Sequence, residues 1–137
     1  MTTTRSGVRI DADSTTMNTA VPGPWALKRA VLHDELGGEP HFVRYAAADG
    51  TALRVICRAA TDSGTALPAN ELATAFVYRA TGQVLARPLR GPVVVLGAGR
   101  VGGLWRSGDL TDFHRALLYS LTRERGCPGE GDWEVAL

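Results

Sequence analysis

Long apolar stretches and excess charge are both missing from this chain. Its 137 residues include 15 Lys and Arg against 14 Asp and Glu, a net charge of +1. A transmembrane helix needs about 20 consecutive apolar residues, and no stretch approaches that length. The balanced charge excludes a protein whose whole surface attracts polyanions. Because residues 1–6 lead into no apolar segment typical of a secretory signal, we expect a cytoplasmic protein without membrane contact.

Cysteine is also scarce, which limits the possible redox chemistry. Cys57 and Cys127 are the two cysteines, and neither belongs to a CxxC motif. A disulfide between them would require an oxidising compartment, which no signal supports. Cys57 lies in the apolar run 53–57, so we expect a buried free thiol. With 45% hydrophobic and 21% charged residues, the chain can form one domain whose core needs no disulfide or metal.

Complete catalytic and metal-binding motifs are lacking too, and no GxSxG motif of a serine hydrolase occurs. Acidic and histidine side chains gather in two places, which are His33, Asp34, Glu35, Glu39 and His41, and then Asp109, Asp112 and His114. The two histidines of the first group fall on different predicted elements, and the acids of the second suit helix capping. We therefore favour solvated helix ends and predict no catalytic residue, no metal ligand and no cofactor.

Residues 1–21 predict a flexible N-terminal arm, and residues 22–137 a single domain. The arm is rich in Thr, Ser and Asp, with only Val8 and Ile10 to bury, so one short strand over 7–11 is the most that we expect there. Apolar spacings of three and four then predict a helix over 24–36.

A hairpin and a second ordered segment follow. The Asp-Gly turn at 48–50 predicts a hairpin of strands 41–45 and 52–57. Residues 61–65 read as a loop. Asn70 suits the cap of a short helix over 71–78, with Leu72, Ala75 and Phe76 facing inward. Val77 and Tyr78 favour a strand nearly as strongly, so both alternatives stay open.

The second half of the chain predicts more strands and a helix. The expected elements are a strand over 82–88 stopped by Pro88, a strand over 92–96, a flexible segment over 97–103, a return strand over 103–106, a helix over 110–123 and an edge strand over 133–135. The run 92–96 is β-branched without alternation, which indicates a central strand covered on both faces. Asp109 or Thr111 would cap the helix, whose inward side chains would be Phe113, Ala116, Leu117, Tyr119 and Leu121. Together these elements predict an α+β fold, a mostly antiparallel sheet with two helices packed against it.

A GxGxxG motif, with Gly97, Gly99 and Gly102, follows the valine-rich strand directly. In dinucleotide-binding domains such glycines lead into a helix whose N-terminus receives the pyrophosphate. Here further glycines interrupt any helix before residue 110, and too few residues follow for the rest of such a domain. A glycine-rich turn between strands is the favoured interpretation, and a nucleotide-cofactor enzyme is an unfavoured alternative.

Arginine is distributed unevenly, with no Asp or Glu between residues 72 and 108. Arg79, Arg87, Arg90, Arg100 and Arg106 all fall in this acid-free stretch. Arginine forks suit phosphate and carboxylate groups, and a tryptophan next to Arg106 would add a stacking surface. The plainer alternative is that these arginines solvate strand edges and turns, and linear charge alone favours it. The candidate binding residues are Arg87, Arg90, Arg100, Trp105 and Arg106.

The order of motifs resembles a small family associated with phages and plasmids whose domain has no assigned function. The resemblance covers residues 24–124 and runs from helix and Gly37-Gly38 through the hairpin to the Leu67-Pro68-Ala69-Asn70 stretch, and then through a Gly-bounded apolar strand to a C-terminal helix. The polar arm before Pro22 and the segment 97–108 are longer than this pattern needs. The resemblance implies an accessory protein of a mobile element in a bacterial cell, and it supplies no catalytic residues.

The leading hypothesis for function is therefore a non-enzymatic accessory protein that binds a macromolecule of the host or of the mobile element. A protein partner with an acidic surface is the first expectation. The alternative is a nucleic-acid-binding protein that uses the arginine-rich region 79–106. The two differ in salt response, because released counterions make nucleic-acid affinity fall steeply as salt rises.

Overall fold

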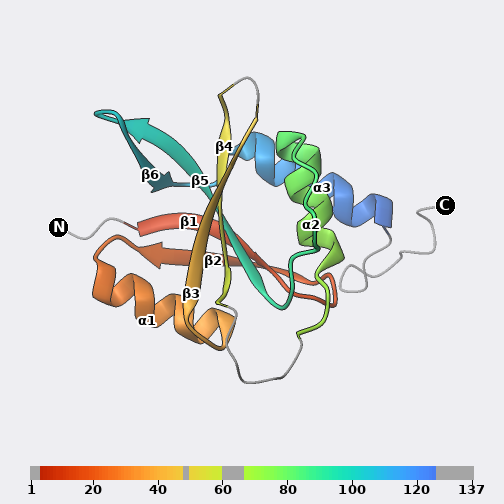
Figure 1. The fold of residues 1–137 in the computed structure, drawn as a ribbon, viewed down its shortest axis with the longest axis horizontal. Helices are drawn as coiled ribbons and strands as arrows, with labels where there is room; N and C mark the ends of the chain where they lie inside the picture. Colours follow the sequence, from red (N-terminus) through yellow and green to blue (C-terminus); the bar gives the residue numbers. More distant parts are fainter. Residues whose placement is uncertain (1–3, 48–49, 60–66, 126–137) are drawn as a thin grey trace.

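A computed structural model describes residues 4–47, 50–59 and 67–125 of the chain. The elements in chain order are β1 (Thr4–Ile10), β2 (Thr16–Pro22), α1 (Trp25–Leu36), β3 (Pro40–Ala46), β4 (Ala52–Arg58), α2 (Glu71–Thr81), β5 (Val93–Val101), β6 (Leu104–Gly108) and α3 (Asp112–Arg125). The strands form one antiparallel sheet in the order β2-β1-β5-β4-β3, with β6 paired to the far part of β5 (Figure 1). The predicted α+β fold is confirmed, with three helices in the described residues in place of two.

The N-terminal segment is a hairpin of the sheet, so the prediction of a flexible arm is wrong for residues 4–21. β1 pairs with β2 along its whole length and also with the first residues of β5. Val8 and Ile10 are buried in the core under α2 and α3, and Val21 is buried in the core under α1. The expected short strand over 7–11 falls largely within β1. The polar composition of this segment led to the wrong prediction. Two or three apolar residues are enough to hold a strand in a sheet when they alternate with polar ones, because they then share one covered face.

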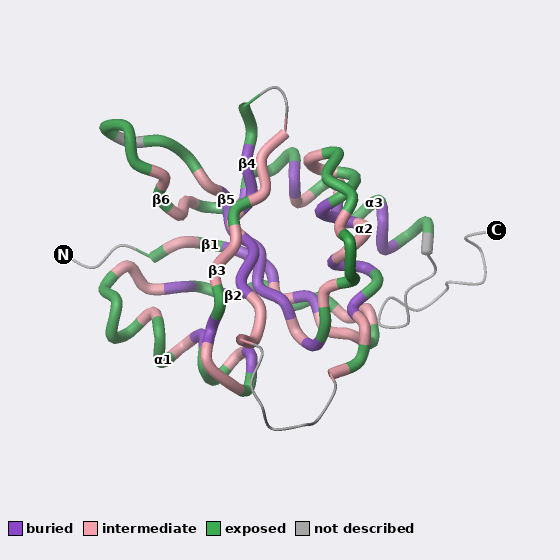
Figure 2. The backbone as a smooth tube through the Cα atoms, in the orientation of Figure 1, coloured by how far each residue is buried: buried purple, intermediate pink, exposed green. Residues whose placement is uncertain are grey.

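β5 is the central strand, as predicted, and it is covered on both faces. Val93 and Val95 pack into the core under α2 and α3, whereas Val94 and Leu96 pack into the core under α1. The three helices thus form two layers on opposite faces of the sheet (Figure 1), and the buried backbone concentrates where β5 runs between them (Figure 2). A strand buried on both faces carries apolar residues without alternation.

The predicted helix over 24–36 and the predicted hairpin of β3 and β4 are confirmed. Pro24 is the N-cap of α1, one residue before the position expected for it, and Gly37 ends the helix with a left-handed backbone at φ 75°. In the hairpin, Phe42 lies opposite Ile56 and Arg44 opposite Arg54. Residues 61–65 and 133–135, for which a loop and an edge strand were expected, lie outside the described residues.

Residues 71–81 form a helix, which decides between the two alternatives. The Asn70 side chain accepts a hydrogen bond from the Ala73 backbone N–H at 3.0 Å, the expected cap. Leu72 and Phe76 face inward as predicted, joined by Ala73 and Val77, whereas Ala75 is only half-buried. The β-branched Val77 is tolerated because its side chain fills the core between α2 and the sheet.

α3 matches the predicted helix but presents a different face to the core. Thr111 caps it, accepting from the His114 N–H, while Asp109 accepts from the Ser6 N–H of β1. Leu121 is buried as predicted and Leu117 is half-buried, whereas Phe113, Ala116 and Tyr119 are exposed. The other buried side chains of α3 are His114, Leu118 and Thr122. The prediction chose the most hydrophobic side chains, which included the two aromatic rings. Spacings of three and four residues around Leu118 instead give the buried face that is observed.

The segment between α2 and β5 holds no strand over 82–88, so that prediction is wrong. Its backbone is irregular, and Val84 is exposed. The Leu89 N–H donates to the Thr74 hydroxyl at 2.9 Å, so part of this backbone is satisfied by α2 rather than by a neighbouring strand. Leu85 and Leu89 pack at the margin of the core.

The GxGxxG segment is part of a β-hairpin. β5 continues through residue 101 and pairs back with β6, so the return strand is confirmed and the expected flexible segment is wrong for residues 97–101. A Cβ on Gly97 would lie 2.2 Å from the Asp109 carbonyl oxygen, whereas a Cβ on Gly99 would meet nothing within 4 Å. Gly97 is therefore required by close backbone packing, and no helix begins within the motif.

This difference predicts a matched pair of variants. We expect Gly97→Ala to lower the free energy of unfolding by about 2–3 kcal/mol, because backbone must move to admit the methyl group. Gly99→Ala, two residues along the same strand, should stay within about 0.5 kcal/mol of the parent. Urea unfolding measures both, and equal losses in the two variants would contradict the packing role of Gly97.

Candidate functional site

The five predicted binding residues separate into two groups. Arg100 and Trp105 are cross-strand partners on the β5–β6 hairpin, and Arg106 follows them. Arg87 and Arg90 lie before the start of β5, where Arg90 donates to the Leu67 carbonyl at 2.9 Å. Seven residue steps of strand, about 23 Å, separate Val93 from Arg100. The structure thus gathers three of the predicted residues at one end of the sheet and leaves Arg87 and Arg90 at the other.

A hollow of about 570 Å³ lies beside the gathered group. It opens between the N-terminal end of α1, the sheet and β6, and its lining residues are Arg5, Gly23, Trp25, Lys28, Phe42, Arg54, Trp105, Arg106 and Ser107. We call this hollow the basic cleft. Part of its lining comes from α1 and from β6, and both elements can be followed in Figure 1. Its volume falls in the range of clefts that hold small organic ligands.

The cations of the basic cleft have no acidic counterparts in its lining. Four of the nine lining residues, Arg5, Lys28, Arg54 and Arg106, are cationic, and none is Asp or Glu. Within the described residues, ion pairs form elsewhere, at Arg9, Arg29 and Arg79. The cleft therefore presents positive charge that the described part of the protein does not neutralise.

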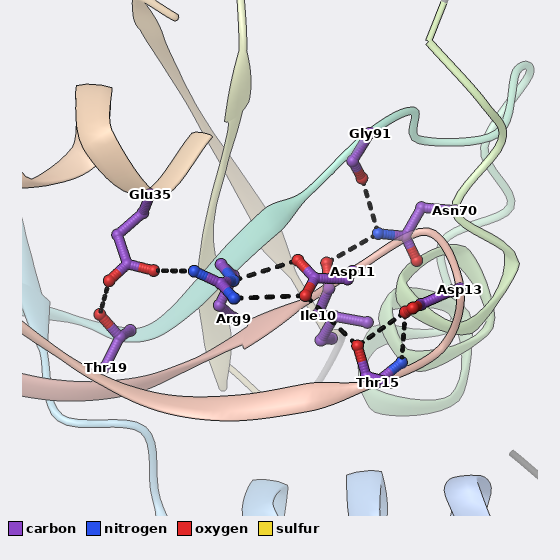
Figure 3. Close-up of polar contacts among 9 residues, drawn as sticks. All are labelled: Arg9, Ile10, Asp11, Asp13, Thr15, Thr19, Glu35, Asn70 and Gly91. Atoms are coloured by element: carbon purple, nitrogen blue, oxygen red, sulfur yellow. Dashed lines mark hydrogen bonds and ion pairs between the residues drawn. The ribbon is translucent and has the colours of Figure 1, made fainter. Parts of the chain in front are cut away.

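Arg9 shows what a neutralised arginine on the same sheet looks like (Figure 3). Its Nη1 donates to Glu35 at 2.7 Å, and its Nε lies 3.0 Å from an Asp11 carboxylate oxygen. Glu35 also accepts from the Thr19 hydroxyl, which links α1 to β2. These contacts join β1, β2 and α1, so we assign this network a structural role.

Burial and mutual repulsion shift the titration of the cleft cations. Burial lowers the pKa of Lys28, and the nearby positive charges of Arg54 and Arg5 lower it further. The pKa of Arg54 is also lowered, first by burial and then by Arg44, which lies directly opposite in the register of β3 and β4. Like charges directly opposite each other destabilise an antiparallel pair. This cluster therefore costs folding free energy in the free protein.

One nitrogen of this cluster is buried without a partner. The Arg54 Nε is inaccessible to solvent and makes no hydrogen bond. Buried N–H groups are nearly always satisfied in folded proteins, so this one adds to the desolvation cost of the cluster.

Aromatic rings form the other part of the cleft. Trp25 is 58% exposed although it opens α1, and its ring centroid lies 5.9 Å from that of Phe42. The Arg44 guanidinium lies 4.4 Å from the centre of the Trp105 ring, and that of Arg100 lies 5.7 Å away. These cation–π contacts fix the Trp105 ring beside the cations. The cleft thus combines flat apolar surfaces with positive charge.

Sequence reasoning missed most of this site. Arg5, Lys28 and Arg54 come from β1, α1 and β4, and Trp25 and Phe42 from α1 and β3. One signal was available, which is the arginine at position 54 inside an otherwise apolar strand, where a charged residue rarely occurs without a partner. No comparable sequence pattern predicts the sheet order, in which β1 and β4 lie on either side of β5.

The described residues offer little to support other chemistry. They contain no group of three His, Cys, Asp or Glu side chains placed to hold a metal ion. Cys57 is a free, half-buried thiol, and burial raises its pKa, which suppresses the reactive thiolate. Of the helices described, none is long and apolar enough to cross a membrane.

In comparisons with known proteins, no family model, curated protein or solved structure matches the chain. The resemblance to a phage- and plasmid-associated family therefore stays a prediction.

Proposed function

We propose that the protein binds single-stranded nucleic acid in the basic cleft. The observation that carries this proposal is the coincidence, in one hollow, of four cations without described acidic partners and three aromatic side chains. Phosphates accept hydrogen bonds from arginine forks, and bases stack on aromatic rings whatever their sequence. The basic cleft thus replaces the linear region 79–106 as the proposed nucleic-acid-binding site.

Single-stranded nucleic acid accounts for more of the cleft than the other partners considered. An acidic protein surface would supply oxygens for Arg54 and Lys28 but would leave the ring of Trp25 unused. A duplex stacks its bases inward, so its bases cannot reach rings inside a hollow. A dinucleotide at the glycine motif lacks the helix N-terminus that such a site needs, because Gly97 and Gly99 lie within a strand. Binding without catalysis also agrees with the accessory role predicted for a phage or plasmid protein.

Fluorescence anisotropy with a labelled oligothymidylate of about 12 nucleotides tests the proposal. We expect binding at low salt, with a log–log salt slope near −3 if four cations each contact a phosphate. A duplex of equal length and a ring-free polyphosphate should both bind more weakly. Absence of oligonucleotide binding at low salt would overturn the proposal, and tighter binding of polyglutamate would identify an acidic protein as the partner.

A matched pair of charge reversals locates the site. Lys28→Glu, in the cleft, should weaken oligonucleotide binding by at least about tenfold, since it replaces attraction by repulsion of a phosphate. Arg87→Glu makes the same change of charge on an exposed residue outside the cleft and should alter affinity by less than about threefold. Equal losses in both variants would show that binding follows net charge and not the cleft.

A further inference from the structure

Three of the cleft cations converge from separate elements. Arg5 belongs to β1, Lys28 to α1 and Arg54 to β4, and each is half-buried. The positive charges of Arg5 and Arg54 both act on Lys28, which places the three groups within electrostatic reach of one another. In the described part of the chain, none of the three forms an ion pair. Such a cluster concentrates positive charge where a single compact anion could contact all three groups.

The geometry also indicates the kind of anion. The three half-buried cations line a hollow of about 570 Å³, so an anion that contacts all of them must be a compact group that enters the cleft. A guanidinium fork and an ammonium group around a tetrahedral oxyanion satisfy several of its oxygens at once, whereas a planar carboxylate has two. The neighbouring Trp25 and Phe42 rings would then face whatever group the anion carries.

We infer that Arg5, Lys28 and Arg54 form a phosphate subsite within the basic cleft. This inference rests on the proposed function for its ligand, since a nucleic-acid strand offers phosphate in two forms, the terminal monoester and the internal diester. The shared chemistry is the tetrahedral phosphoryl group. The carbon-bearing part of the ligand extends toward the aromatic rings.

Thermal unfolding in phosphate tests the subsite without any oligonucleotide. At equal ionic strength and pH, inorganic phosphate should raise the Tm of the parent chain by about 3–5 °C more than chloride does, because it binds only the folded state and relieves repulsion. Arg54→Gln should lose this difference. Arg79→Gln, which removes an exposed arginine paired with Glu124 outside the cleft, should keep it. Equal stabilisation of both variants, or no phosphate effect on the parent, would overturn the inference.

Oligonucleotides with and without a 5′-phosphate identify the source of the phosphoryl group. A preference of about tenfold for the phosphorylated strand, lost in Arg54→Gln, assigns the subsite to a terminal phosphate. Equal affinities, with both strands displaced by inorganic phosphate, assign it to an internal one. If strands bind but phosphate neither competes nor stabilises, the subsite is wrong and the proposed function stands. If phosphate stabilises the parent but no strand binds, the subsite stands and the proposed function fails.

Discussion

We expect Asn70→Ala to lower the free energy of unfolding by about 3–4 kcal/mol, the largest loss among the substitutions considered. The Asn70 side chain is fully buried and uses both ends. Its oxygen accepts from the Ala73 N–H at the start of α2. Its amide nitrogen donates to the carbonyls of Ile10 at 2.9 Å and Gly91 at 2.7 Å (Figure 3). One side chain thus joins the end of β1, the approach to β5 and the N-terminus of α2.

The expected size follows from those three hydrogen bonds. Loss of a helix cap costs about 1 kcal/mol, and loss of each of the two buried hydrogen bonds to the carbonyls costs about 1–1.5 kcal/mol. The corresponding fall in Tm is about 10–15 °C for a chain of this length. Urea and thermal unfolding measure the loss.

Asn18→Ala is the control for this prediction. Asn18 is exposed and accepts a single hydrogen bond from Arg115, so its removal should cost less than about 0.5 kcal/mol. A loss below about 1.5 kcal/mol for Asn70→Ala would show that water replaces its contacts, and that the three segments are held together by packing alone.

Asn70 also shows what could be predicted from the sequence. Its role as a cap was predicted, because capping is a local property of Asn followed by a helical pattern. Its two long-range bonds to Ile10 and Gly91 were not, because they depend on the neighbourhood of β1 and β5 in the sheet. The same contrast between local and long-range signals applies to the strands. The run of valines indicated that the central strand is buried on both faces, whereas no local pattern indicated the burial of the N-terminal hairpin.

The binding site was harder to predict than the fold for the same physical reason. The linear stretch 79–106 has no acidic residue, yet its arginines do not lie together in the fold. Arg87 and Arg90 precede β5, whereas Arg100 and Arg106 lie at or beyond its far end. The cations that converge in the cleft instead come from distant parts of the chain, which also contain acids such as Glu35. The net charge of a sequence window counts the side chains on both faces of a strand. A cleft, by contrast, is lined only by the side chains of one face.

The second large effect concerns Arg54, whose replacement by methionine should raise stability while it removes binding. Arg54→Met should weaken oligonucleotide binding by about 30-fold or more, since it removes a charge-assisted contact to phosphate in a half-buried site. The same change should raise the free energy of unfolding by about 1 kcal/mol, a modest figure because solvent screens this half-exposed group. Methionine keeps the apolar stem and abolishes the repulsion by Arg44 and Lys28.

Opposite signs in the two measurements are what distinguish a binding residue from a structural one. Arg79→Met, in the exposed pair with Glu124, should leave both affinity and Tm nearly unchanged, since such pairs contribute little. Calorimetry and anisotropy on the same samples provide the comparison. If Arg54→Met unfolds more easily than the parent, Arg54 supports the sheet and is a structural residue. If it unfolds less easily and no longer binds, the unfavourable charge at position 54 is maintained for a ligand, because folding alone gains nothing from it.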